Sequence, residues 1–581
     1  MSTADGAIVG TVKVVDHGPV ERRFNIVVLG DGFQAADLPT FRTRVADLVD
    51  ELRVREPLRQ FWPLINIFRI DVASVDSGID HPATGVFRRT FFDGRATGRP
   101  REVRSDERLV HRVCRQQVSQ YHFPVLILND PGNFGTGAGE VAALSMGATG
   151  FSTTTVHELG HSAFALDDEY DEAGDPAGYF GVEPAARNVT KETTPARVKW
   201  RSLRPTPLPF VANADCSKPS QNENGLPAGQ LGIFAGADHV HCGLHRPAGR
   251  CRMRLDTDSM CPVCLDHAQT TLRKFRPLAI ERSRFAMPAE ALLATAFPLA
   301  SGPHVLAYAV GRGDAALMLV APDATNLTTV LSRNLGLGWT SIVPLALTGG
   351  AHLLLHNALT GRTEISKVAA DGSAITTVFP TTWTTGWTNM TSFPLGRRAY
   401  LFSYKALSGR AAIDEIAADG TGTLSMFDSA IELGFSDFAA IERVDPLNPT
   451  LPPGGALLAG HKGATGEVVL FLVGDRGTSL TEVKRFSAMP FATSFVPVRA
   501  RRELLLAVYN AVTGEVRWVF ANDVGFALNS PPPAGSFALV ELGTSAWGKL
   551  WTAIAPFELG GVTHWFAHRA SDGAAVLDRV D

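Results

Sequence analysis

Two histidines stand four residues apart in the stretch TTTVHELGHSAFALDDEYDEAGD, residues 153–175. If this stretch is helical, His157 and His161 differ by about 40° of rotation and about 6 Å of rise, so both imidazoles project from one face. Two neutral imidazoles at this spacing can bind one zinc ion, and Glu158 is placed to reach a water on that ion without binding the metal. The pattern therefore predicts a zinc site on a helix.

The chemistry expected of such a site follows from the ion. Zinc polarises a carbonyl group and lowers the pKa of a bound water toward neutrality. Glu158 can take a proton from that water and return it to a leaving amine, first as general base and then as general acid. The predicted reaction is hydrolysis of an amide, with a peptide bond as the expected substrate. A purely structural helix is the alternative.

A catalytic zinc ion usually has three protein ligands and one open position. The acids of LDDEYDE, residues 166–172, are the natural candidates for the third ligand. A straight helix cannot bring them in, because seven residues beyond His161 lies about 10 Å further along the axis. The chain must therefore turn sharply soon after Phe164, unless the third ligand comes from elsewhere in the chain.

The residues around the histidines form a longer motif, His157-Glu158-Leu159-Gly160-His161-Ser162 followed by Leu166-x-Asp168-Glu169-Tyr170. This motif resembles the signature of the IgA peptidase family of zinc metallopeptidases, which is grouped with the metzincins. The resemblance spans roughly residues 20 to 280 and implies a metzincin-like fold with one catalytic zinc ion. Other stretches that carry it are VVLGDGF (27–33), PLINIFRIDVASVDSG (63–78), VLILND (125–130), GLHRPAGRCRMR (243–254) and MCPVC (260–264).

The resemblance also implies roles for single residues near the histidines. It assigns the third-ligand role to Asp168, with Asp167 and Glu169 as alternatives. Asp167 competes because it lies six residues after His161, which is the common metzincin spacing. Metzincins turn at a glycine shortly after the second histidine, whereas this chain has Ser-Ala-Phe-Ala over residues 162–165.

Two further residues take roles by resemblance. Met253 is implied as the methionine of the turn beneath the zinc ion, with Met260 as the alternative. Where the family tends to show Gly-Leu-Tyr-Arg-Pro, this chain has Gly-Leu-His-Arg-Pro over residues 243–247. His245 is therefore a candidate for stabilising the oxyanion, and a surface histidine without such a role is the alternative.

Five of the six cysteines fall in one segment, and Cys114 stands apart. Clustering of this kind indicates local cross-links or a metal site. Disulfides are the favoured interpretation, with a second, structural zinc ion or free thiols as alternatives. The acids between residues 167 and 175 could also hold calcium, although their spacing lacks an EF-hand pattern. The clustered cysteines are Cys216, Cys242, Cys251, Cys261 and Cys264.

The zinc helix must be positioned by neighbouring elements, which apolar runs and their spacing predict. Strands are expected at residues 23–33, 65–74 and 123–130, with a helix at 37–54. Residues 140–146, EVAALSM, are expected to form an edge strand before the zinc helix. In metzincins the strand at this place binds the substrate backbone in extended form.

From about residue 285 the sequence pattern changes to short apolar runs separated by Gly, Asp and Thr. Residues 341–379 and 389–427 both carry AL-T/S-GR and then AADG at matched offsets, and about six such units follow one another. Each unit is interpreted as three strands. One unit cannot bury its own apolar faces, so a β-propeller of about six blades is expected, with paired β-sandwiches as the alternative. The last blade is expected to pair with a strand from near residues 284–300, which would hide a sheet edge.

The sequence thus predicts an α/β (α+β) metzincin-like zinc peptidase domain over residues 1–283 and an all-β, propeller-like domain over 284–581. The expected function is a zinc-dependent endopeptidase that acts on polypeptides. The propeller is expected to bind the substrate or a protein or glycan partner. The alternative is a binding or adhesion protein whose zinc domain is structural or inactive.

Composition excludes some other classes of function. The net charge is −4 and no basic run stands out, so nucleic acid is not an expected partner. No apolar stretch reaches the roughly 18 residues of a membrane span. The start, MSTADGAIVG, lacks the basic and apolar regions of a Sec signal peptide, so a cytoplasmic location or export by another route is expected.

Overall fold

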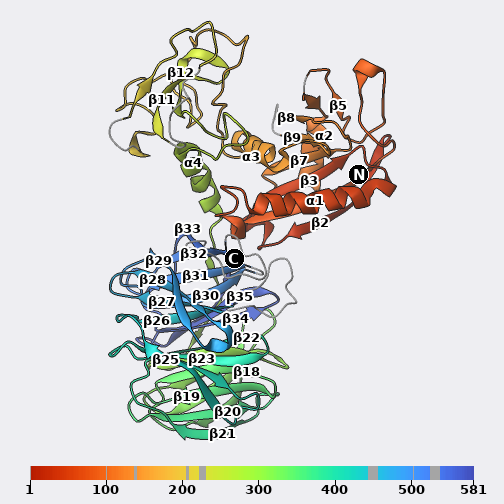
Figure 1. Cartoon of the computed structure of the whole chain (residues 1–581). Helices are drawn as coiled ribbons and strands as arrows, with labels where there is room; N and C mark the ends of the chain where they lie inside the picture. The colour runs from red at the N-terminus through yellow and green to blue at the C-terminus, as the bar shows by residue number, and fades with distance from the viewer. Residues whose placement is uncertain are drawn as a thin grey trace. The chain divides into compact units, whose positions relative to one another are not determined.

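The computed structural model describes residues 2–99, 101–136, 141–203, 208–220, 230–442, 456–500, 503–523 and 537–581. The chain forms two compact units, Met1–Phe275 and Arg276–Asp581, which run from red to yellow-green and from green to blue in Figure 1. The predicted domain boundary, between residues 283 and 284, lies a few residues further along the chain. Strands are many and helices few in both units. None of the described helices is long and apolar enough to cross a membrane.

The first unit is built on a seven-stranded mixed sheet in the order β1-β2-β4-β3-β7-β9-β8. Figure 1 labels β2, β3, β7, β9 and β8 of this sheet. Strands β4, β3, β7 and β9 are parallel, β2 pairs antiparallel with β4, and β8 pairs antiparallel with β9. All residues of β3 are buried, because a parallel strand inside a sheet is covered on both faces. The strands are β1 (Ser2–Thr3), β2 (Gly6–Val15), β3 (Phe24–Asp31), β4 (Ile65–Ser74), β7 (Phe123–Leu128), β8 (Gly135–Thr136) and β9 (Ala142–Ser145). The predicted strands at 23–33, 65–74 and 123–130 are confirmed.

Helices pack against this sheet through apolar stripes. Helix α1 (Leu38–Arg53) contacts β4 and α3, and it buries Phe41, Val45 and Leu48 at the predicted helical spacing. Helix α2 (Glu107–Gln117) contacts β7, and α3 (Phe151–Ser162) contacts β7, β8 and β9. Helix α4 (Pro262–Leu272) follows later in the unit. Short 3-10 turns are η1 (Val20–Arg22), η2 (Ala35–Asp37), η3 (Trp62–Leu64), η4 (Pro82–Thr84), η5 (Arg201–Leu203) and η6 (Arg273–Phe275).

The predicted edge strand has neighbours on both sides. Strand β9 pairs with β7 along its whole length, and Ala143 and Leu144 also pair with Thr136 and Gly135 of β8. The expectation that β9 itself is the sheet edge is therefore wrong at these two residues, because the short strand β8 covers them. Glu140, at the start of the predicted strand, lies outside the described residues.

Smaller sheets complete the first unit. Strands β5 (Arg95–Ala96) and β6 (Val103–Arg104) form one pair, and β10 (Phe210–Val211), β11 (Leu231–Ala237) and β12 (Val240–Ala248) form a three-stranded sheet. The turn between β11 and β12 consists of Asp238 and His239, whose φ angles are 50° and 56°. Two positive φ angles are the signature of a tight type I′ hairpin turn, which Asn and Gly usually occupy.

The described residues of the second unit form six four-stranded antiparallel sheets, which is compatible with the predicted all-β character. The sequence-based interpretation of three strands per unit is wrong, because a fourth strand follows the AADG turn. The first sheet consists of β14 (Leu292–Leu299), β15 (Gly302–Ala309), β16 (Asp314–Val320) and β17 (Leu327–Asn334). The second consists of β18 (Ser341–Leu347), β19 (Gly350–His356), β20 (Arg362–Val368) and β21 (Ile375–Thr382). The third consists of β22 (Asn389–Leu395), β23 (Arg398–Tyr404), β24 (Arg410–Ile416) and β25 (Thr423–Ala430).

The other three sheets continue the series, and the last one has a different make-up. The fourth sheet consists of β26 (Asp437–Glu442), β27 (Ala456–Lys462), β28 (Glu467–Val473) and β29 (Leu480–Ser487). The fifth consists of β30 (Ser494–Ala500), β31 (Glu503–Asn510), β32 (Glu515–Asp523) and β33 (Phe537–Ala546). The sixth consists of β34 (Ala553–Leu559), β35 (Val562–His568), β36 (Ala574–Val580) and, from the start of the unit, β13 (Ala279–Ala286). A 3-10 turn, η7 (Asp475–Gly477), joins β28 and β29.

The sheets of the second unit contact one another in a repeating way. The first strand of each sheet contacts the first strand of the next, through β14, β18, β22, β26, β30 and β34, and β34 also contacts β14. The last sheet is completed by β13, which pairs antiparallel with β36. The strand that completes it thus begins slightly before the predicted range of 284–300, and β14 from that range opens the first sheet instead.

The repeated motifs mark turns within the sheets. In AL-T/S-GR, Gly361 has a φ of 75°, and a Cβ there would lie 2.0 Å from the carbonyl oxygen of Trp383. Only glycine fits that position without a shift of the backbone. The second strand of each sheet also ends near a buried aromatic ring, and tyrosine alternates with histidine from sheet to sheet. These residues are Tyr308, His356, Tyr404, His461, Tyr509 and His568.

Candidate metal centre

Helix α3 carries the two histidines and then ends in a sharp turn. Its residues from Phe151 to Gly160 are buried, so the polar side chains among them need partners inside the protein. Past Ser162 the amide of Ala165 donates to His161 O (3.1 Å), and the amide of Leu166 donates to Gly160 O (3.0 Å). Ala165 has a φ of 50°, so an alanine takes the left-handed conformation for which a glycine was expected. The turn predicted soon after Phe164 is therefore present.

Three donor atoms converge where the chain returns past the helix. His157 Nε2 and His161 Nε2 are 3.2 Å apart, and Asp168 Oδ1 lies 3.2 Å from each of them. The other ring nitrogens contact backbone carbonyl oxygens, since His157 Nδ1 is 2.9 Å from Arg252 O and His161 Nδ1 is 2.8 Å from Leu166 O. These contacts orient both Nε2 atoms toward the carboxylate.

The distances between these atoms, and the hydrogen bonds that they make, fit a zinc ion. Bonds of about 2.0–2.1 Å to a tetrahedral zinc ion separate the ligand atoms by about 3.3 Å. Asp168 Oδ1 is buried and makes no hydrogen bond within the described residues, although two imidazole nitrogens lie close to it. A buried oxygen of this kind calls for an unseen partner such as an ion. The side chain of His161 is 24% exposed, so the cluster reaches solvent on one side.

Protonation of the cluster reflects its compact arrangement. Burial lowers the pKa of His157, but its contact with Asp168 and the nearby Glu158 outweigh burial and raise that pKa to about 9. Burial would raise the pKa of Asp168, but contacts with His157, His161 and His239 hold it well below its usual range. Metal ligands of these types bind in their deprotonated forms, so a cation and the shared protons compete for the same atoms.

Glu158 lies beside the cluster without entering it. Its residue is 9% exposed, and burial is the main cause that raises the pKa of its carboxyl group. The imidazoles of His157 and His161 oppose that shift. A carboxylate whose pKa is raised from its normal value is better matched to proton transfer near neutral pH.

The three consecutive acids after the turn have three different sets of neighbours. Only Asp168 joins the two histidines. Asp167 is tied through its backbone to Asn188, whose Oδ1 accepts from the Asp167 amide (3.0 Å). Glu169 is fully buried in a different cluster, with Cys251, Cys261 and Cys264.

The remaining acids of this segment do not converge on a calcium-like site. Asp171 accepts hydrogen bonds from the amide (2.6 Å) and hydroxyl (2.7 Å) of Ser220 and lies 3.0 Å from His241 Nδ1. Asp175 accepts from the amide of Glu172 at 2.6 Å. Since these carboxylates are engaged separately, the calcium alternative gains no support from the described part of the chain.

Met253 lies directly against helix α3. It is fully buried, and a Cβ on Gly160 would lie 2.5 Å from its Sδ atom. Gly160 thus lets the methionine approach the helix between the two histidines. The preceding residue, Arg252, supplies the carbonyl oxygen that contacts His157 Nδ1, so one tight turn both supports the helix and orients His157.

His245 is placed differently from the expectation. Its ring packs against Phe210, with centroids 5.6 Å apart, and its backbone pairs with that of Thr190. Its residue is 5% exposed, so it is not a surface histidine. None of its described contacts involves His157, His161 or Asp168.

Two residues near Asp168 were not predicted as site residues. His239 Nε2 is 3.4 Å from Asp168 Oδ2, and the ring of Tyr170 lies 4.8 Å from that of His239 and 6.5 Å from that of His157. Burial and the neighbouring Asp168 raise the pKa of the Tyr170 phenol, so it stays protonated and can donate. Tyr170 belongs to the predicted motif, but nothing in the local sequence marks His239, which the β11–β12 turn delivers.

The cysteines divide into two groups. Cys216 and Cys242 form a disulfide, whereas Cys251, Cys261 and Cys264 are buried and unlinked. The favoured interpretation of disulfides throughout the segment is therefore right for one pair and wrong for the other three, which gather around Glu169 instead.

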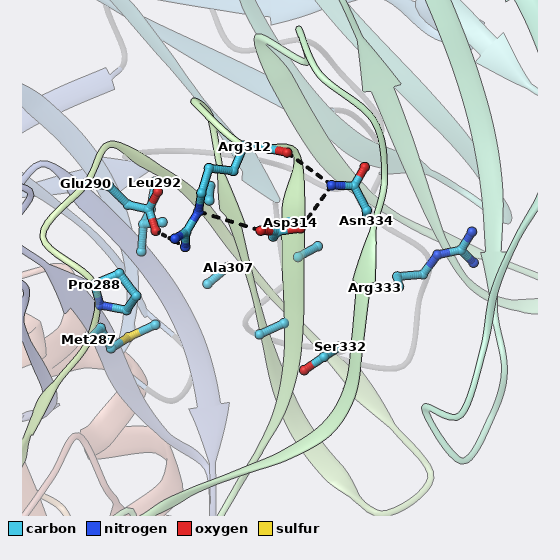
Figure 2. Close-up of a pocket in the computed structure, with 13 residues that line it drawn as sticks. Met287, Pro288, Glu290, Leu292, Ala307, Arg312, Asp314, Ser332, Arg333 and Asn334 are labelled. Atoms are coloured by element: carbon cyan, nitrogen blue, oxygen red, sulfur yellow. Dashed lines mark hydrogen bonds and ion pairs between the residues drawn. The ribbon is translucent and has the colours of Figure 1, made fainter.

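A separate cavity of about 380 Å³ lies in the second unit, beside the sheet of strands β14 to β17 (Figure 2). Arg312 pairs there with Glu290 (2.5 Å) and Asp314 (3.5 Å), and the side-chain amide of Asn334 donates to Asp314 Oδ1 (2.9 Å). Because these charged groups satisfy one another, the cavity resembles a structural polar cluster more than a reactive site. It contains none of the predicted site residues.

Comparison with known proteins agrees with the motifs. Residues 12–223 match the model of the family described as IgA Peptidase M64. No curated protein matches the chain. Among solved structures, a protein from Lactobacillus plantarum is similar at 15% sequence identity, over 43% of this chain and 70% of that chain, with a TM-score of 0.31. Over residues 12–223, this chain therefore matches the IgA peptidase family, as the motif around His157 predicted.

Proposed function

We propose that the first unit is a zinc-dependent endopeptidase in which His157, His161 and Asp168 hold one zinc ion. The match to a peptidase family supports hydrolysis of peptide bonds as the reaction. The observation that carries the metal assignment is the convergence of three donor atoms at 3.2 Å, one of them a buried oxygen without a hydrogen bond. Among the described residues, the oxygen of Asp168, and not one from Asp167 or Glu169, groups with the nitrogens of both histidines, which favours Asp168 as the third ligand.

The reaction divides between the ion and the protein. A zinc ion bound at this site supplies a Lewis acid and lowers the pKa of water. The Glu158 carboxylate accepts a proton from the attacking water and returns it to the leaving amine. Met253 packs against helix α3, and the backbone carbonyl oxygens of Arg252 and Leu166 keep both imidazoles in position.

A donor is also needed where negative charge develops on the substrate carbonyl oxygen. His245 was expected to serve, but its described contacts lie with Phe210 and Thr190. Tyr170 and His239 lie beside Asp168 and carry suitable hydrogens. We favour Tyr170 for this role, because its hydroxyl group keeps its proton.

The second unit is proposed to be a six-bladed β-propeller that binds the substrate or a partner. The circular series of contacts between first strands and the pairing of β13 with β36 support this architecture. Such pairing between the two ends of a domain leaves no open sheet edge between the first and last blades. The partner, whether protein or glycan, is not defined by any described feature.

The peptidase proposal is tested with Glu158→Gln. The variant keeps the shape of the side chain but cannot accept a proton, so cleavage of a peptide library, read by mass spectrometry, should fall about 10²–10⁴-fold. Its zinc content should equal that of the wild type, since Glu158 is not a ligand. Glu172→Gln, an exposed change in the same segment, is the control and should retain activity. Full activity in Glu158→Gln would contradict the proposal and favour a binding protein with an inactive zinc domain.

A further inference from the structure

We propose that the chain binds a second, structural zinc ion through Cys251, Cys261, Cys264 and Glu169. This site is separate from the one that His157 and His161 form, and the inference does not depend on the peptidase activity. One sulfur or oxygen atom from each of the four residues lies within 4.8 Å of the other three, and all four residues are buried. Three thiolates with one further ligand are a common donor set for structural zinc.

The individual contacts support a metal-binding arrangement. Glu169 Oε1 lies 2.9 Å from Cys264 Sγ and 3.8 Å from Cys261 Sγ. Ligand atoms around a tetrahedral zinc ion with bonds of about 2.0–2.3 Å are separated by about 3.3–3.8 Å, so small shifts suffice for coordination. The amide of Cys261 also donates to Cys251 Sγ at 3.2 Å, which favours the thiolate form that a metal requires.

Glu169 is the residue that is hardest to explain without a cation. It is fully buried, yet its Oε2 atom makes no hydrogen bond within the described residues. Its Oε1 atom accepts a hydrogen bond from Asn188 Nδ2 at 3.0 Å, which fixes the carboxylate toward the sulfurs. A buried carboxylate facing three thiols is costly, whereas a carboxylate that coordinates zinc is not.

The surroundings help to balance the charge of such a site. Cys261 is the N-cap of helix α4 and Cys264 lies in its first turn, where the helix dipole stabilises negative charge. The guanidinium group of Arg254 donates to the backbone oxygen of Glu169 at 2.9 Å. With four protein ligands there is no open position for a substrate, so the role of this ion would be structural.

The second ion would tie together the two segments that complete the first metal site. Glu169 directly follows Asp168, and its amide donates to Met253 O at 2.7 Å. Cys251 directly precedes Arg252, whose carbonyl oxygen contacts His157 Nδ1. One zinc ion would thus fix both the third ligand and the methionine turn relative to helix α4.

The test measures the number of zinc ions per purified chain by inductively coupled plasma mass spectrometry. The wild type should hold two ions per chain, and Cys264→Ser and His161→Ala should each hold one. Cys114→Ser removes a buried, unlinked cysteine outside the cluster and should keep both. The difference between Cys264→Ser and His161→Ala separates failure of this inference from failure of the proposed active site.

A second measurement does not depend on a cysteine variant. Cobalt-substituted wild type should show sulfur-to-cobalt charge-transfer absorption, because the site of His157, His161 and Asp168 contains no sulfur. The band should persist in His161→Ala. A wild type with one zinc ion that is lost in His161→Ala, or no sulfur-to-cobalt absorption, would overturn the inference. So would peptide mapping that shows a disulfide between two of the three cysteines.

Discussion

At the scale of single residues, backbone atoms orient the two histidines of the proposed metal site. The carbonyl oxygens of Arg252 and Leu166 contact the Nδ1 atoms of the two histidines, and His157 Nδ1 also lies 3.4 Å from Asp256 Oδ1. Asp168 is the exception, because its second oxygen lies 3.4 Å from His239 Nε2. Side-chain substitutions around the site should therefore affect Asp168 more than His161.

Tyr170→Phe tests the proposed donor to the oxyanion. The change removes only the hydroxyl group and keeps the ring that packs near His157 and His239. Loss of one such donor should lower kcat about 10²-fold with little change in KM. Steady-state kinetics and zinc content of the variant provide the measurement.

His245→Gln is the comparison for that prediction, since the described contacts of His245 do not reach the three ligands. It should leave kcat within a few-fold of the wild type. If His245→Gln lowered kcat as strongly as expected for Tyr170→Phe, and Tyr170→Phe did not, the assignment of the donor would be reversed.

At the scale of elements, the end of α3 decides whether the site can form. The helix stops at Ser162, and Ala165 reverses the chain in a left-handed conformation, so that Asp168 returns to the histidines. Left-handed backbone costs a residue with a Cβ about 1–2 kcal/mol, and a β-branched side chain more. The turn is therefore a place where local strain is tolerated so that Asp168 lies beside the two histidines.

Substitutions at Ala165 should reveal that strain. Ala165 is exposed, so changes there act mainly through the backbone. Ala165→Val should lower the free energy of unfolding by about 1–2 kcal/mol, whereas Ala165→Gly should stay within about 1 kcal/mol of the wild type. Urea unfolding monitored by circular dichroism provides the measurement. Ala163→Val, at a right-handed position of the same turn, is the control and should cost less than Ala165→Val.

At the scale of the whole molecule, the second unit is a series of related sheets. Tyrosine and histidine alternate at the end of the second strand, and the tyrosine hydroxyl groups donate to backbone oxygens of Gly336, Glu432 and Gly548. The alternation indicates that the repeating element consists of two sheets, used three times. The last sheet combines both ends of the unit, so its stability depends on residues far apart in the sequence.

Asp578 of β36 should make the second unit less stable as the pH rises. It is 1% exposed and accepts a hydrogen bond from Trp547 Nε1 at 2.6 Å, and burial raises its pKa to about 6. A carboxyl group with a raised pKa in the folded state favours folding while it is protonated. That contribution is present below the unfolded pKa and is lost between about pH 4 and pH 6.

Asp578→Asn should remove this dependence and keep an acceptor for Trp547. The difference in free energy of unfolding between Asp578→Asn and the wild type should shift in favour of the variant by about 2 kcal/mol from pH 4 to pH 7. Urea titrations at several pH values measure it. Asp323→Asn, at an exposed turn where hydrogen bonds from Thr325 lower the pKa of the carboxyl group, should show a constant difference from pH 4 upward. A constant difference for Asp578→Asn would contradict the assignment.

The sequence by itself determined the features that depend on local periodicity. The spacing of His157 and His161 requires only a helix, and the repeated AL-T/S-GR and AADG segments require only that glycine occupy turns with positive φ. The strands of the first unit were predictable for the same reason, because apolar runs must be buried. The number of strands per repeat was not, since the fourth strand is half exposed and its apolar pattern is weak.

The tertiary structure alone decided which partners these residues meet. Asp167, Asp168 and Glu169 are consecutive acids, yet the backbone of Asp167 binds Asn188, Asp168 lies beside the two histidines and Glu169 lies beside the three cysteines. Successive side chains of a non-helical segment point in different directions, so their surroundings depend on what packs on each side. The same holds for His239 and for Cys251, Cys261 and Cys264, because contacts between distant segments are set by the packing of the whole unit and leave no periodic trace in the sequence.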